Sequence, residues 1–80
     1  MEQPARTPKQ IGAIVRRQRR RLALSQSELA EKTGLRQATI SALEAGEQSA
    51  RLRTLFDVMS ALGVEMVVRD RRKASPEDIF

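Results

Sequence analysis

The sequence predicts a small, mostly α-helical domain of four short helices followed by one β-strand. Three observations predict this class. Apolar residues recur at three- and four-residue spacing, two capping signals mark helix starts, and three glycines stand where helices should end. With 80 residues, the chain is long enough for one domain whose core is small, which favours self-association.

The first helix is predicted over residues 8–22. Thr7 suits the N-cap, Pro8 suits the first helical position, and Gln10 completes a capping box. Residues 1–7 are expected to form a flexible N-terminal tail. The apolar side chains at helical spacing, which predict the buried face, are Ile11, Ile14, Val15 and Leu22.

The second and third helices are predicted close together. Ser25 and Glu28 form a capping box for a helix over residues 26–33, and Gly34 stands at the left-handed position after it. The third helix is expected from Gln37 to Gly46. Two helices joined by a glycine turn within about twenty residues are typical of a helix-turn-helix, whose second helix enters the major groove of DNA.

The third helix has an unusual outward face. The chain is 31% charged, yet residues 37–43 carry no charge. On a helical wheel Ile40 and Leu43 face the core, and the outward residues are Gln37, Ala38, Ser41, Ala42 and Ala45. Small side chains permit close approach, a glutamine amide pairs with adenine, and an alanine methyl contacts thymine. The alternative is that alanine and glutamine are simply good helix formers.

The fourth helix shows a stripe of five apolar residues and ends at Gly63. The stripe consists of Leu52, Leu55, Phe56, Met59 and Leu62. Residues 64–69 then favour a strand, whose apolar members are Val64, Met66, Val67 and Val68. A single strand needs a partner, so we expect the same strand of a second copy, in a homodimer that reads a palindromic site. The alternative is an irregular segment.

The ordered domain is therefore expected over residues 8–70, with a flexible C-terminal tail over residues 71–80. Two apolar residues, Ile79 and Phe80, end this polar tail. One interpretation is that they anchor a partner protein, because one aromatic side chain in a pocket can dominate a small interface. The alternative is that they have no role.

Composition narrows the function. The net charge is +5, and residues 1–25 carry seven of the 15 basic residues. This pattern indicates a polyanionic partner, or else a solvated helix face. Cysteine, histidine, tryptophan and tyrosine are absent, which argues against an enzyme, a metal site or a cofactor. Two phenylalanines disfavour single-stranded nucleic acid. No signal peptide or membrane span is evident, so a cytoplasmic location is expected.

The segment "SQSELAEKTGLRQATISALEAGE" resembles the helix-turn-helix of the Cro/C1-type (XRE) repressor family, and the resemblance covers residues 8–68. Gln26, Ala30 and Gly34 match constrained positions, whereas Arg51 replaces a Ser or Thr cap. The resemblance implies a lambda-repressor-like fold that binds double-stranded DNA. It implies base reading by Arg36, Gln37, Ala38 and Ser41, phosphate binding by Gln26, Thr39, Arg51 and Arg53, and a structural pair between Arg19 and Glu44.

A narrower resemblance is carried by "QSELAEKTGLRQATIS" and the later "VVRDRRKASPED". Both are similar to HipB-type antitoxins, which bind HipA-type serine/threonine kinase toxins and repress their own operon. Two alternatives stay open: a stand-alone or phage-type regulator with the same DNA chemistry, and a protein-interaction module that no longer binds DNA. The neutral outward face of the third helix argues against the latter.

Overall fold

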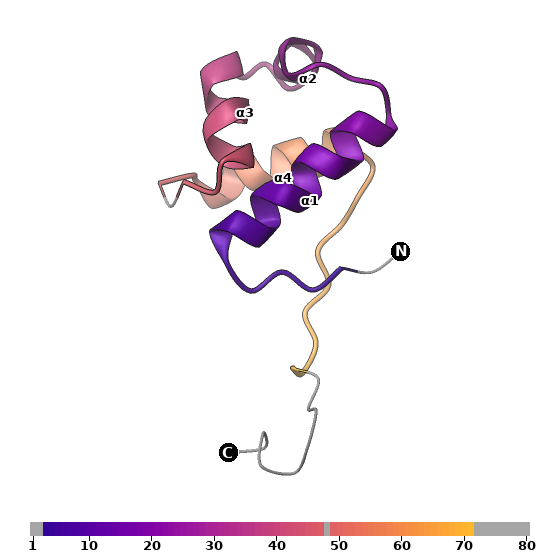
Figure 1. Ribbon diagram of the computed structural model, residues 1–80, viewed down its shortest axis with the longest axis vertical. Coiled ribbons are helices and arrows are strands. Elements are labelled where there is room, and N and C mark those ends of the chain that lie inside the picture. Colours follow the sequence, from indigo (N-terminus) through magenta and orange to yellow (C-terminus); the bar gives the residue numbers. More distant parts are fainter. Residues whose placement is uncertain (1–2, 48, 72–80) are drawn as a thin grey trace.

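The computed structural model describes residues 3–47 and 49–71, which contain four α-helices. These are α1 (Pro8–Arg21), α2 (Gln26–Thr33), α3 (Gln37–Glu44) and α4 (Leu52–Ala61). Helix α3 packs against α1 and α2, and α2 also packs against α4. In Figure 1, α4 lies behind α1, and the chain after α4 runs away from the helical body.

The core lies where these helices meet. Its buried side chains come from all four helices and the turn after α4: Val15, Leu29, Ala30, Ile40, Leu43, Leu55, Val58 and Leu62. The predicted core of α1 and α3 is correct in its main members, because Val15, Ile40 and Leu43 are buried. Leu22 was expected on the buried face of α1, but the helix ends at Arg21 and Leu22 is 46% exposed.

The predicted stripe of α4 is correct for Leu55, Met59 and Leu62 but wrong for Leu52 and Phe56. Leu52 and Phe56 are 64% and 48% exposed, whereas Val58, which the stripe omitted, is fully buried. Helix α4 buries Leu55 and Val58 in the core, on the side where it meets α2. Leu52 and Phe56 lie outside this buried part of the helix surface. Periodicity identified an apolar helix correctly but did not fix which part of its apolar arc the other helices cover.

Local signals place most helix ends correctly. Ser25 and Glu28 form the predicted capping box, with Ser25 N–H donating to Glu28 Oε1 at 2.8 Å and Glu28 N–H donating to Ser25 Oγ at 2.9 Å. At α1, Thr7 accepts from Gln10 N–H at 3.1 Å, but the Gln10 side chain accepts from Arg6 N–H, so that box is incomplete. Helix α3 ends at Glu44, two residues before the expected Gly46.

Residues 64–71 form no strand within this single chain. Three of their apolar side chains are exposed, by 44% for Met66, 64% for Val67 and 98% for Val68. A strand that pairs only with a second copy has no hydrogen-bonding partner in one chain. The pairing of Val64, Met66, Val67 and Val68 across a homodimer therefore stays a prediction.

Candidate nucleic-acid interface

Helices α2 and α3 are held at a fixed angle by a short turn. Gly34 has a φ of 73°, in the left-handed region that favours glycine. Its N–H donates to the Glu31 carbonyl at 3.3 Å, and Leu35 N–H donates to the Ala30 carbonyl at 3.0 Å, which closes the helix end. Ala30 is only 5% exposed, so a small side chain sits in the α2 part of the core. This arrangement is a helix-turn-helix.

The outer face of α3 matches most of the predicted face, although Ala42 is half-buried and Ala45 follows the end of the helix. Ile40 and Leu43 point into the core, whereas Gln37, Ala38 and Ser41 are exposed. Arg36, the N-cap of α3, is also exposed and does not cap the helix with its side chain. The structure therefore brings the four predicted base-reading residues together at the N-terminal end of α3. That end offers an amide, a methyl, a hydroxyl and a guanidinium, with no acidic group among the four.

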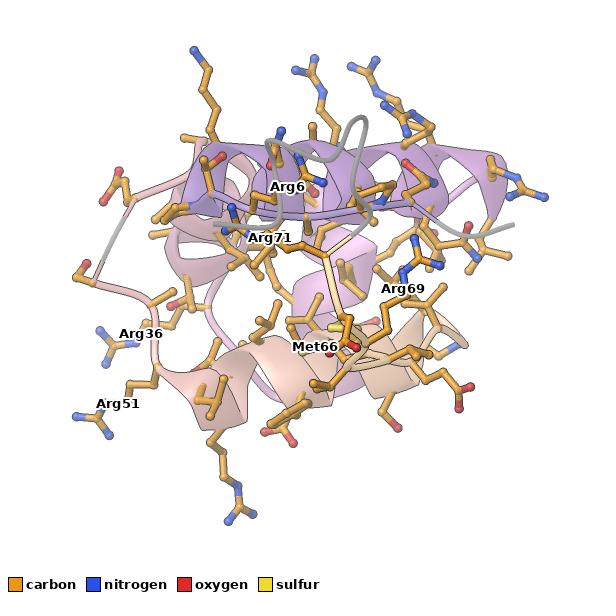
Figure 2. The ribbon with its side chains drawn as sticks, turned by 90° about the horizontal axis from the view of Figure 1, so that it is seen from below. Arg6, Arg36, Arg51, Met66, Arg69 and Arg71 are labelled. Carbon is orange, nitrogen blue, oxygen red and sulfur yellow. The ribbon has the colours of Figure 1, made fainter. Side chains whose placement is uncertain are left out.

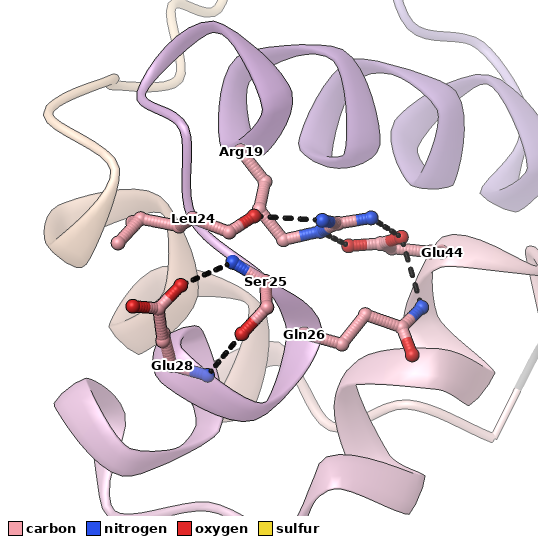
Figure 3. A network of polar contacts seen from close by, with 6 residues as sticks. All are labelled: Arg19, Leu24, Ser25, Gln26, Glu28 and Glu44. Atoms are coloured by element: carbon pink, nitrogen blue, oxygen red, sulfur yellow. Dashed lines mark hydrogen bonds and ion pairs between the residues drawn. The ribbon is translucent and has the colours of Figure 1, made fainter.

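Behind this face, α1 and α3 are joined by a salt bridge between Arg19 and Glu44 (Figure 3). Arg19 Nε donates to Glu44 Oε2 at 2.6 Å, and a second guanidinium nitrogen donates to Glu44 Oε1 at 3.0 Å. The two side chains are only 9% and 4% exposed. Arg19 also donates to the Leu24 carbonyl at 2.8 Å, which ties the turn between α1 and α2 to the same pair.

The charges of this pair are mutually stabilised. Burial raises the pKa of the Glu44 carboxyl, but hydrogen bonds from Arg19 and Gln26 lower it, and the net pKa lies below the usual value. The hydrogen bond to Glu44 raises the pKa of Arg19. Both groups are therefore ionised at neutral pH, as a buried ion pair requires.

Gly12 lets α1 approach α3 closely. A Cβ added at Gly12 would lie 2.5 Å from the carbonyl oxygens of both Leu43 and Glu44. Any larger residue would push the two helices apart. The sequence alone indicated no role for Gly12, because a close helix crossing leaves no periodic signal.

An open depression of about 480 Å³ lies beside α3. Its lining includes Ala38, Thr39 and Ala42 of α3, together with Arg36 and Arg51. In Figure 2 the side chains of Arg36 and Arg51 project to the same side of the molecule. Two cations and the Thr39 hydroxyl therefore border one concave surface, although the carboxylate of Glu47 also borders it. The sequence analysis predicted DNA contacts for four of these residues, Arg36, Ala38, Thr39 and Arg51, but not the depression.

The other predicted phosphate-binding residues differ in their surroundings. Arg53 is exposed and lies 4.0 Å from Asp57, in an i, i+4 pair on α4. Gln26, the first residue of α2, is half-buried, and its Nε2 donates to Glu44 Oε1 at 3.1 Å. The predicted contact of Gln26 with phosphate did not anticipate this internal partner.

The exposed arginines of α1 lie along two edges. Arg16 lies three residues before Arg19 on α1, so the two share the side of the helix that faces α3, and its charge helps to lower the pKa of Glu44. Arg17 instead bonds to Gln3, and Arg21 bonds to Gln18, whose amide donates to the Leu62 carbonyl. Arg17 and Arg21 therefore face the N-terminal segment and the end of α4.

Other kinds of site find no support in the part of the chain that the structure describes. There, no group of three or more acidic, cysteine or histidine side chains could hold a metal ion. No helix within residues 3–47 and 49–71 has the length and apolarity needed to cross a membrane. The proposed anchor residues Ile79 and Phe80 lie outside the described residues.

Comparisons with known proteins agree with this geometry. Residues 15–69 match the model of the helix-turn-helix family. The chain is 37% identical over 71 residues to Antitoxin HipB of Escherichia coli K12, which covers 89% of this chain and 81% of that protein. It is also 39% identical over 67 residues to an uncharacterized HTH-type transcriptional regulator of Methanothermobacter thermautotrophicus, covering 84% of each chain.

Solved structures give the same result. A structure described as a HipB-O4 20mer complex superposes with a TM-score of 0.82 at 32% identity, covering 89% of this chain and 100% of that chain. A HipA-HipB-O2-O3 complex superposes with the same TM-score of 0.82 and identity of 32%, again covering 89% of this chain and all of that chain. The fold and the surface of α3 define a helix-turn-helix protein of the Cro/C1 type. Within that class, the chain belongs to the HipB antitoxin family.

Proposed function

We propose that this chain is a cytoplasmic, sequence-specific repressor that binds double-stranded operator DNA and acts as the antitoxin of a HipA-like kinase toxin. The observation that carries the proposal is the exposed, uncharged face at the start of α3, on a helix-turn-helix of the HipB family. A surface helix without a binding role normally exposes Lys and Glu. By autoregulation, the repressor would control the operon that encodes it and its toxin. No catalytic activity is proposed.

Base reading falls to residues at the beginning of α3. Arg36 suits guanine, the Gln37 amide suits adenine, the Ala38 methyl suits a thymine methyl, and Ser41 suits several base edges. Phosphate binding falls to Thr39 and Arg51 at the depression, to Gln26 and, on α4, to Arg53. The depression supports this assignment, because it lies directly beside the base-reading face.

A homodimer completes the proposal. Two copies related by a two-fold axis would present two α3 helices to a palindromic operator. We assign the dimer contact to the exposed segment that contains Met66, Val67 and Val68. The HipA-HipB-O2-O3 complex supports a toxin partner for this chain as well. Ile79 and Phe80 are proposed as an auxiliary anchor for that toxin.

The experiment is a mobility-shift titration with the DNA upstream of the protein's own gene. Gln37→Ala should cost about 1–3 kcal/mol at one base position and relax specificity there. Ser60→Ala, at an exposed position of α4 outside this face, should bind like the wild type and is the matched control. If Gln37→Ala weakens binding equally to every operator variant, Gln37 contacts only the backbone. If the wild type does not bind this DNA, the repressor proposal fails.

The toxin is tested separately by co-purification with the protein encoded by the neighbouring gene. A kinase that co-purifies supports the antitoxin role. A chain that binds its operator but has no kinase neighbour would be a stand-alone regulator of the same class. Deletion of residues 75–80 should leave operator binding intact and weaken toxin binding, and unchanged toxin affinity would exclude the anchor.

A further inference from the structure

The side chain of Gln26 is held in place before any DNA arrives. Gln26 begins α2, is half-buried, and donates from Nε2 to Glu44 Oε1 at 3.1 Å. A glutamine amide has two N–H donors and one carbonyl acceptor. Among the described residues this is the one hydrogen bond of the Gln26 side chain, so one N–H stays available for another acceptor.

The group that holds Gln26 is itself fixed. Glu44 receives two hydrogen bonds from Arg19, at 2.6 Å and 3.0 Å, and its side chain is only 4% exposed. Arg19 is fixed in turn by the Leu24 carbonyl at 2.8 Å. Figure 3 shows this continuous chain of contacts, which runs from the α1–α2 turn through Arg19 and Glu44 to Gln26.

We propose that Glu44 is a positioning residue for operator binding, which orients the Gln26 amide so that its second N–H meets a DNA phosphate. The inference rests on the proposed DNA-binding function. A long, flexible side chain loses conformational freedom when it is immobilised at an interface. Because Glu44 has already immobilised Gln26 in the free protein, that loss does not recur on binding. The buried ion pair thus serves the interface as well as the fold.

The first test measures the orientation directly in the free protein. Side-chain amide relaxation by NMR should give Gln26 a clearly higher order parameter than a glutamine whose side chain moves freely. Gln37 is the internal control, because its amide is exposed and it begins α3 as Gln26 begins α2. Its order parameter should be clearly lower than that of Gln26. If Gln26 is as mobile as Gln37, the proposal is overturned, whatever the protein does with DNA.

The second test measures the coupling in operator affinity. The double substitution Arg19→Met with Glu44→Leu removes the anchor without leaving one buried charge unpaired. In the wild type, Gln26→Ala should weaken operator binding about tenfold, because it removes a charge-assisted hydrogen bond to a phosphate. In the double variant the same substitution should cost less than about threefold, since the amide is no longer oriented.

Arg51→Ala is the matched control in both backgrounds. Arg51 lies at the depression and not in the network, so its loss factor should be the same with and without the ion pair. An equal loss for Gln26→Ala in the two backgrounds overturns the positioning role and leaves the repressor function standing. If the wild type does not bind its operator, both the positioning role and the repressor function are wrong. If the double variant does not fold, the NMR comparison alone decides.

Discussion

Arg19 of α1 and Glu44 of α3 form a nearly buried, two-point salt bridge with a shortest N–O distance of 2.6 Å. The two residues are 25 positions apart in the sequence. It coincides with the close approach of the two helices at Gly12. One salt bridge and one residue without a side chain therefore shape the contact between α1 and α3.

Arg19→Ala should destabilise the fold by roughly 3–5 kcal/mol, because it leaves the Glu44 carboxylate buried without its cationic partner. Arg20→Ala is the control, since Arg20 is the next residue and is exposed. Urea unfolding followed by circular dichroism gives both values. Equal midpoints for the two variants would show that the ion pair does not hold the helices together.

Stability should fall in acid because the folded state lowers the pKa of Glu44. A carboxyl with a depressed folded-state pKa stabilises the protein above its unfolded pKa, near 4.5. That stabilisation is lost as the pH falls through the lower folded value. Unfolding titrations between neutral pH and about pH 2.5 should show this loss. In the Arg19→Met, Glu44→Leu variant the free energy of unfolding should fall less steeply at acid pH. An equal fall in the two proteins would contradict the role given to Glu44. Glu28, which Ser25 also shifts downward in pKa, accounts for part of the remaining slope.

How much the sequence could predict depends on the range of each contact. The capping box of Ser25 and Glu28 spans three positions, so the local sequence pattern was enough to locate it. The outward face of α3 followed from the 3.6-residue period. The Arg19–Glu44 pair was predicted only through a family resemblance, because its partners are distant in sequence.

The features that were missed are tertiary. Gln26 and Glu44 are 18 residues apart, and nothing in their local sequence marks the bond. Two members of the α4 stripe were wrong because Leu52, Phe56 and Val58 are all apolar, and only the packing of the other helices decides which of them is covered. The depression next to Arg51 needs two helices and a loop placed in space.

Ala23→Gly should raise stability by up to about 1 kcal/mol. Ala23 has a φ of 57°, the one positive value among the non-glycine residues that the structure describes. This conformation closes the end of α1, where Leu24 N–H donates to the Arg19 carbonyl at 3.1 Å. A Cβ is strained there, and glycine is not.

The reverse substitution, Gly34→Ala, is the control. Gly34 has a φ of 73°, and an added Cβ would meet no atom within 4 Å, so any loss is backbone strain alone. It should cost about 1 kcal/mol. Both values come from chemical denaturation, and a decrease in stability for Ala23→Gly would contradict the strain argument.

The two edges of α1 should differ in their effect on salt dependence. If Arg16 neutralises one phosphate, Arg16→Ala should reduce the log–log slope of operator affinity against salt by about 0.9. Arg17→Ala should leave the slope unchanged, because Arg17 faces Gln3 on the other edge. Both variants keep the fold's buried groups intact. Titrations from low to moderate salt measure the slopes, and equal slopes for the two variants would remove the distinction between the edges.

Val67→Pro should loosen the dimer. Val67 is 64% exposed and its neighbour Val68 is 98% exposed, so the described residues of this chain leave both side chains uncovered. If the segment pairs as a strand with its copy, proline removes one N–H donor from the ladder of hydrogen bonds.

Val67→Thr is the control, because threonine keeps the N–H and the β-branched shape. Sedimentation of both variants over a concentration series measures the monomer–dimer equilibrium. Weaker association of the proline variant alone supports strand pairing. An unchanged dimer would assign the contact to helix packing instead, with the exposed Leu52 and Phe56 of α4 as the surface to test.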